Sequence, residues 1–291
     1  MPIKEAVTRI GLVLSIMIFS SGCSTIQQAP KDEPVIKKWS EVKNGKTIDY
    51  MTIDGIMVHE TDPTKQPLPK IVTPGTPSCG DQVGNAPSDA VVLFDGTAES
   101  MQNWTDTKGN PTKWQYVNGV LESVNKAGFI QSKQKFGSCQ FHIEWASPAT
   151  VKGSGQGRGN SGVFIMSNYE VQILDSFNNE TYADGQAGAL YGRKKPLVNA
   201  SSGPGQWQTY DILFHRPTFD KDGKLLKRAT FTVFHNGVVI HDNETLWGGT
   251  DWKGSHSISD YQAHADELPL KLQDHDSPVK FRNIWVRSLA D

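Results

Sequence analysis

The sequence predicts an all-β protein whose main part is a two-sheet antiparallel β-sandwich of the jelly-roll type. From residue 90 onward, apolar residues occur in short or alternating runs, and no long stretch repeats with the period of an amphipathic helix. Asn-Gly, Asp-Gly and other glycine-containing pairs separate these runs, as they do in β-hairpins. About ten strands without an internal repeat favour two stacked sheets over a propeller.

The first 22 residues are predicted to be a cleaved export signal. Lys4 and Arg9 lead into an apolar run over 10–19, and small residues then precede Cys23. The run is too short to cross the hydrocarbon core of a bilayer, which needs about 20 apolar residues. Its end resembles a bacterial lipobox, although Ser20 stands where leucine is usual. The resemblance implies a lipoprotein anchored through Cys23 to the periplasmic or outer face of the cell envelope, and an ordinary secretory signal is the alternative.

Residues 23–89 are predicted to be mainly an extended tether. They are rich in Pro, Lys, Asp, Thr and Gln, and therefore bury little apolar surface. Segment 47–58 alternates like a strand pair, so we expect a hairpin there that packs on the main domain at 90–291. Cys79 and Cys139 can form a disulfide in an oxidising compartment, which would fasten the tether to this domain, and two unpaired thiols are the alternative.

The main domain is expected to contain the strands in chain order. They span 90–94, 114–117, 120–121, 128–132, 139–145, 161–166, 169–174, 207–214, 229–235, 238–241 and 279–288. Asn118-Gly119 and Asn236-Gly237 separate two successive pairs of strands, because both residues of such a turn tolerate positive φ. The tryptophans Trp104, Trp114 and Trp285 are expected in the core.

Composition excludes a polyanionic partner. The formal net charge is −2, and no basic stripe of the kind that binds nucleic acid is present. The glycine-rich stretch 153–159 precedes a strand and lacks a Gly-Lys-Ser/Thr ending, so it is expected to be a rim loop and not a phosphate loop. The oligomeric state stays open.

Four segments in a fixed order carry a family resemblance. They are 93–96 with Trp104 and 114–120, 159–164 with 169–175, 188–192 with 205–207, and 272–275 with 278–285. Together they resemble the 3-keto-disaccharide hydrolase family. The resemblance implies a fold of the concanavalin A-like lectin and glucanase type, and an enzyme that acts on 3-keto sugars. Three features depart from the family pattern: Met166 replaces a common arginine, Asp276 replaces a glycine, and 251–270 is predicted to be an insertion.

The strand within 169–175 carries the candidate site. Its period of two sends Glu170 and Gln172 to one face and their apolar neighbours to the core. A polar face on the concave sheet of a sandwich is where a sugar would bind. Asp175 follows where the strand ends, so it can approach the same cleft from its end.

Two kinds of chemistry fit these residues. An ordinary glycosidase needs a carboxylic acid and a carboxylate, which Glu170 and Asp175 can supply. A 3-keto sugar allows another route, because the ketone acidifies the C2 proton and the C1 substituent can then leave by elimination. For that route we expect Glu170 or Asp175 as the general base, with His275 or Arg282 stabilising the oxyanion. The residues expected to bind the sugar are Asn160 and Gln172 through hydrogen bonds, Tyr191 and Trp207 through their rings, and Arg158 from the glycine-rich loop.

Each candidate has a structural alternative. Glu170 and Gln172 can form the solvated face of an edge strand, Arg282 can pair with a structural carboxylate, and His275 can be a turn residue. For the whole protein, the alternatives to an enzyme for 3-keto sugars are a non-catalytic carbohydrate-binding lipoprotein and an ordinary glucanase-type glycosidase.

The sequence contains no cofactor fingerprint. A divalent metal such as Ca²⁺ would suit a β-sandwich. The side chains near the carboxyl terminus that can ligate a metal are His256, His264, Asp266, Asp274, His275 and Asp276. Their spacing matches no tight ligand motif, so the metal question stays open.

Overall fold

The computed structural model describes residues 34–60, 64, 68–251 and 257–290. The predicted export signal and Cys23 lie outside these residues. The chain divides into two compact units, of which the second begins at Ile71. Within the described ranges, no helix is long and apolar enough to cross a membrane.

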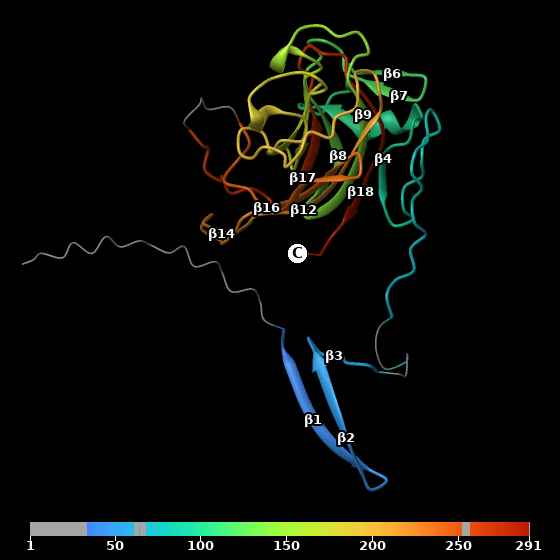
Figure 1. The fold of residues 1–291 in the computed structure, drawn as a ribbon, viewed down its shortest axis with the longest axis vertical. Helices are drawn as coiled ribbons and strands as arrows, with labels where there is room; N and C mark the ends of the chain where they lie inside the picture. Colours follow the sequence, from blue (N-terminus) through green and yellow to red (C-terminus); the bar gives the residue numbers. More distant parts are fainter. Residues whose placement is uncertain (1–33, 61–63, 65–67, 252–256, 291) are drawn as a thin grey trace, which may run out of the picture. The chain divides into compact units, whose positions relative to one another are not determined.

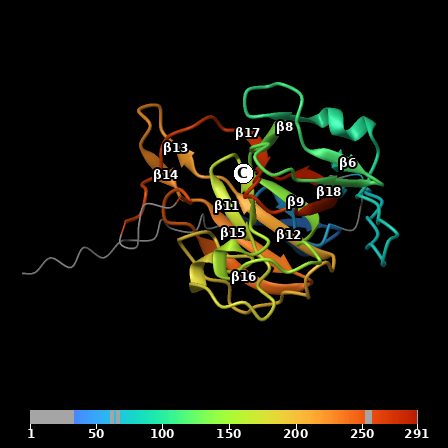
Figure 2. The same cartoon turned by 90° about the horizontal axis from the view of Figure 1, so that it is seen from above.

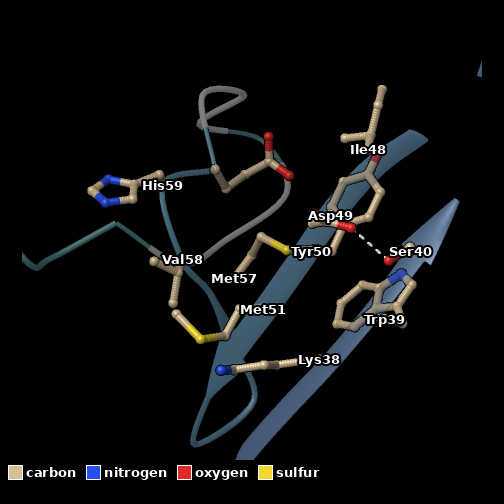
Figure 3. Close-up of a pocket in the computed structure, with 11 residues that line it drawn as sticks. Lys38, Trp39, Ser40, Ile48, Asp49, Tyr50, Met51, Met57, Val58 and His59 are labelled. Carbon is tan, nitrogen blue, oxygen red and sulfur yellow. Dashed lines mark hydrogen bonds between the residues drawn. The ribbon is translucent and has the colours of Figure 1, made fainter. Parts of the chain in front are cut away.

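The first unit contains a small antiparallel sheet in the order β1 (Ile36–Lys43), β2 (Lys46–Ile53) and β3 (Ile56–Met57) (Figure 1). Trp39 of β1 pairs with Tyr50 of β2, and their rings stack with centroids 5.4 Å apart. Figure 3 shows these two side chains beside the hydrogen bond from Ser40 to Asp49 (2.6 Å). The predicted hairpin at 47–58 is therefore present as β2 and β3, but β1, expected as tether, is its main partner. Its predicted packing on the main domain stays a prediction.

The second unit is the predicted β-sandwich (Figures 1 and 2). The larger sheet has the order β16 (Val238–Thr245), β15 (Thr230–His235), β12 (Gln208–His215), β9 (Cys139–Ala146), β18 (Lys280–Ser288), β7 (Val120–Glu122) and β6 (Gln115–Val117), with β4 (Val91–Phe94) also paired to β18. The smaller sheet has the order β11 (Tyr169–Ile173), β10 (Ser161–Ile165), β17 (Leu268–Leu272), β8 (Ile130–Phe136) and β5 (Trp104–Asp106). The strand pairs in both sheets are antiparallel, which confirms the predicted fold class.

Short elements complete this unit. They are the strands β13 (Thr218–Phe219) and β14 (Leu225–Lys227) and the 3₁₀ helices η2 (Glu99–Asn103), η3 (Gly155–Gly157) and η4 (Ala183–Gly185). Strand β17 was not predicted, and it begins inside the segment that we expected to be an insertion.

Alternating apolar side chains from the two sheets form one core. Phe141 and Ile143 of β9 meet Val163 of β10 and Val171 of β11 in this cluster, and all four are fully buried. Burial of side chains of this size stabilises a fold by about 1.5–3 kcal/mol each relative to exposure. Trp104 and Trp114 belong to the core as predicted. Trp285 is buried but lies outside this cluster, where it stacks on His142 with ring centroids 4.9 Å apart.

The segment 71–89, expected to be tether, is part of the second unit. Its Asp89 accepts two hydrogen bonds from Arg287 of β18, at 2.7 and 2.8 Å. The disulfide that we expected to hold this segment is not formed, because Cys79 and Cys139 are both free thiols. Cys139 faces the apolar core, where burial raises the pKa of its thiol to about 12, whereas Cys79 is exposed.

Candidate active site

Glu170 and Gln172 lie side by side on one face of β11, as the strand period predicts. Glu170 is 5% exposed and Gln172 is 1% exposed, so these residues are not the solvated face of an edge strand. The outer edge of β11 is covered by the segment 188–191. Gly188 donates to the Gln172 carbonyl (2.8 Å), and Tyr191 donates to the Glu170 carbonyl (3.2 Å). This backbone pairing holds both side chains in place.

A glycine in the neighbouring strand makes room for the Glu170 carboxyl group. Gly162 of β10 pairs with Gln172, and Phe164 pairs with Glu170. A Cβ atom added at Gly162 would lie 2.3 Å from Glu170 Oε1, closer than atoms of this kind approach. The carboxyl group of Glu170 therefore lies over the backbone of β10 in a space that only glycine leaves open.

An amide network extends from Glu170 along the same face. With its nitrogen toward Glu170, Gln172 donates to Oε1 of that residue (3.0 Å) and to the Ser161 carbonyl (2.9 Å). The other end of the Gln172 amide lies 3.0 Å from the side-chain amide of Gln156. Asn160 donates to the Gln156 carbonyl (2.8 Å). Gln172 and Asn160 are thus brought together with Glu170, as predicted.

The environment of Glu170 changes its acidity. Burial raises the pKa of the Glu170 carboxyl group to about 8, because a buried site disfavours the charged form. A carboxyl group with a pKa in this range can accept a proton near neutral pH and return it. Strongly shifted carboxyl groups of this kind are typical of catalytic sites.

Lys271 of β17 is a second charged group on this face, and the sequence analysis missed it. Phe164 pairs with Glu170 on one side and with Lys271 on the other, so the three side chains form one row across three strands. Neighbouring strands are about 4.8 Å apart, which places the Cα atoms of Glu170 and Lys271 about 10 Å apart. Burial lowers the pKa of Lys271, and its Nζ donates to the Ser167 carbonyl (3.3 Å). Leu268, Leu270 and Leu272 alternate around it in the sequence, which is the signal that could have revealed this strand.

Aromatic side chains surround the row. The rings of Phe164 and Phe129 lie 5.5 Å apart, centroid to centroid. Tyr191, a predicted sugar contact, shares a hydroxyl–hydroxyl hydrogen bond of 2.7 Å with Tyr182. Burial, this hydrogen bond and the charges of nearby acidic groups, including Glu170, hold the pKa of Tyr182 well above its usual value. The two tyrosines therefore form an amphipathic rim near Glu170.

Asp175 does not join Glu170. Its carboxylate pairs with Arg158 (2.8 Å), and Asn179 donates to its backbone carbonyl (2.7 Å). Asp175 and Arg158 line a separate cavity of 350 Å³, whose lining does not include Glu170. The predicted pairing of Glu170 with Asp175 is therefore not supported, and Arg158 neutralises Asp175.

Arg282 and Trp207 also lie together, at the larger sheet. The Arg282 guanidinium donates to Glu144 Oε2 (2.7 Å) and stacks 4.2 Å above the Trp207 ring. Burial alone would raise the pKa of Glu144, but hydrogen bonds from His142, Asn283 and other donors lower it to about 2. Arg282 thus pairs with a structural carboxylate, which was the alternative to a catalytic role.

His275 lies in the bend after β17 and is exposed. Three of the other metal-ligand candidates have protein partners: His264 with the Tyr169 hydroxyl (2.6 Å), Asp266 with Arg216 (2.5 Å), and Asp274 with the Gly128 amide (3.1 Å). His256 lies outside the described residues. Among the residues that are described, no three His, Cys, Asp or Glu side chains gather in a way that could hold a metal ion.

Comparison with known proteins identifies the domain. Residues 89–287 match the family described as the 3-keto-alpha-glucoside-1,2-lyase-like domain. A protein from Parabacteroides distasonis ATCC 8503, provisionally described as a glycosyl hydrolase, is 43% identical over 80% of this chain and 97% of its own, with a TM-score of 0.73. A second protein with that description from the same organism is 21% identical over 69% of this chain and 94% of its own, with a TM-score of 0.52, and shares the fold. No match was found among curated proteins. Through its domain at 89–287, the chain belongs to the 3-keto-disaccharide hydrolase family.

Proposed function

We propose that this protein cleaves the glycosidic bond of 3-keto-disaccharides or 3-keto-glycosides by removing the proton at C2. Membership of the family supports a carbohydrate-active function. The observation that carries the mechanism is the buried carboxyl group of Glu170, which has a pKa of about 8 and shares a face with Lys271. The comparison family is described as a lyase, which agrees with a route through elimination.

The reaction can be written with Glu170 as the only base. Its ionised carboxylate takes the C2 proton, and the electrons of that bond form an enolate whose charge rests on O3. When the ketone re-forms, a C1–C2 double bond appears and the bond from C1 to the leaving oxygen breaks. A proton from Glu170 or from water neutralises the leaving oxygen. Water then adds across the double bond, with hydroxyl to C1 and hydrogen to C2, so the net reaction is hydrolysis.

Lys271 takes the role that we expected of His275 or Arg282. Arg282 is bound to Glu144 at the other sheet, and His275 lies in an exposed bend. The ammonium group of Lys271 uses one donor on the Ser167 carbonyl and has two further donors for the enolate oxygen. A fixed positive charge in a half-buried site stabilises a developing oxyanion more than it would in water. The amides of Gln172 and Asn160 would bind hydroxyl groups of the same sugar ring.

The test is sugar release from 3-keto-trehalose, 3-keto-sucrose and 3-keto-lactose, beside their unoxidised parents. We expect the wild type to cleave only the keto forms, and Glu170→Gln to lose turnover by orders of magnitude while binding is retained. Arg158→Lys, a change outside the Glu170 row, serves as the control for general disturbance. Absence of turnover in a folded wild type that still binds sugar, with equal affinity in Glu170→Gln, would instead indicate a carbohydrate-binding module.

We also propose that the protein is exported and anchored to the cell envelope through a lipid on Cys23. The support is the signal-like sequence before Cys23. Cells that express the wild type should incorporate labelled fatty acid into the protein and retain it in the membrane fraction. Cys23→Ser should abolish both, and persistent labelling of this variant would refute the proposal.

A further inference from the structure

A cavity of 600 Å³ lies beside the row of Glu170, Phe164 and Lys271. We call it the 249–264 cavity, after the segment that supplies most of its described lining. Its other walls come from Phe164, from the turn at 167–169 between β10 and β11, and from Leu268. Its volume falls within the range of about 300–1,000 Å³ that is usual for small-molecule sites.

Two contacts join this cavity to Glu170. Phe164, which lines it, is the cross-strand partner of Glu170. Thr250, which also lines it, accepts a hydrogen bond from the Glu170 backbone N–H at 2.6 Å and donates to the Asn168 carbonyl at 3.0 Å. The cavity is thus attached to the strand that carries the base.

The cavity and the amide network lie on opposite sides of Glu170 along β11. Gln172 and Asn160 follow the direction of the chain away from Glu170 and across to β10, whereas the turn at 167–169 lies at the other end of these strands. If the amides hold hydroxyl groups of the keto sugar while its C2 lies at Glu170, the opposite end of the substrate is directed toward the cavity.

The described lining is suited to an uncharged polyol. It offers amide and hydroxyl groups from Asn168, Gln262 and Ser259, together with the ring of Tyr261. Tyr261 is fixed, because its hydroxyl accepts from the Ala229 N–H (3.0 Å) and donates to the Leu246 carbonyl (2.9 Å). The lining contains Asp251 and Asp260 but, among its described residues, no Lys or Arg. An acidic ligand would therefore meet no neutralising charge there.

We propose that the 249–264 cavity is the subsite for the sugar that leaves from C1, and that it selects a neutral hexose over an acidic one. This inference rests on the proposed function. Much of the wall comes from the segment that the sequence analysis identified as an insertion relative to the family, so the insertion provides the leaving-group specificity of this chain.

A plug in the cavity tests the proposal. Gly249 lines it, and a Cβ atom added there meets no atom within 4 Å, so Gly249→Leu can place its side chain in the cavity. The two substrates are 3-keto-trehalose, whose leaving group is glucose, and methyl 3-keto-α-glucoside, whose leaving group is methanol. We expect kcat/KM to fall about tenfold or more for the first and to change less than about threefold for the second. A 3-keto-glucoside with glucuronic acid as leaving group should be a poor substrate of the wild type.

Gly203→Leu is the matched control, because an added Cβ there meets only the end of the Gln206 side chain, at 3.8 Å, and Gly203 lies outside the cavity lining. It should leave both substrates unaffected. If Gly249→Leu is unfolded by circular dichroism, Gln262→Ala, an exposed lining residue, should raise KM for 3-keto-trehalose alone. Equal loss on both substrates, or no loss on either, overturns the subsite.

A direct binding measurement separates this inference from the proposed function. If the wild type cleaves neither substrate, the proposed function fails, and titration with glucose then decides the subsite alone. Binding that Gly249→Leu abolishes and Gly203→Leu retains would support it. A wild type that binds no glucose would refute it.

Discussion

A single methyl group at Gly162 should disable the site without unfolding the protein. The added Cβ would lie 2.3 Å from Glu170 Oε1, 2.9 Å from Phe164 Cε2 and 3.0 Å from Glu170 Cδ. The carboxyl group must move by about 0.7 Å or more to reach even 3.0 Å, the shortest separation that such atoms normally show. A catalytic group displaced by about 1 Å can lose about 100-fold in rate.

We therefore expect Gly162→Ala to lower kcat for 3-keto-trehalose by about 100-fold. Overpacking of this kind costs about 1–3 kcal/mol of stability, which a fold of this size tolerates. Stopped assays of glucose release and urea denaturation would measure the two effects separately. Gly157→Ala is the control, because an added Cβ there meets nothing within 4 Å. A Gly162→Ala variant that keeps wild-type kcat would refute the placement of the Glu170 carboxyl group over β10.

Three further predictions concern charge. Because the pKa of Glu170 is raised to about 8 and the base is its ionised form, kcat/KM should rise about 50-fold from pH 6 to pH 8 and level off above, and a flat profile would exclude Glu170 as the base. The same shift has the opposite effect on stability: the contribution of Glu170 is fully present below pH 4.5 and is lost as the pH rises through about 8, and denaturation of Glu170→Gln should lack this loss. Lys271→Met should lower kcat by about 100-fold with a smaller change in KM, and Lys271→Arg should restore part of it, whereas unchanged kcat in Lys271→Met would remove Lys271 from the mechanism. Arg282→Met should lower the free energy of unfolding by about 3–5 kcal/mol, because it leaves the buried Glu144 carboxylate without its main partner, and a stable variant with impaired catalysis would instead return Arg282 to the active site.

Much of the fold followed from local sequence patterns. Alternating apolar residues and Asn-Gly turns predicted most strands of the sandwich, because the side-chain period of a strand is independent of its neighbours. The same rule placed Glu170 and Gln172 on one face. Strand β17 was missed because it is short and lies within a segment that we expected to be an insertion.

The amino acid sequence by itself determined the strands, the polar face of β11 and the family; the tertiary structure decided which charges meet. Asp175 and Arg282 both carry groups suited to catalysis, but Asp175 pairs with Arg158, and Arg282 pairs with Glu144, 138 residues away. Strand register brought Lys271 next to Phe164, and hence into the row with Glu170. Alternation is a property of one strand, whereas ion pairing and burial depend on strands that are distant in sequence, and only the folded chain specifies which of them are neighbours.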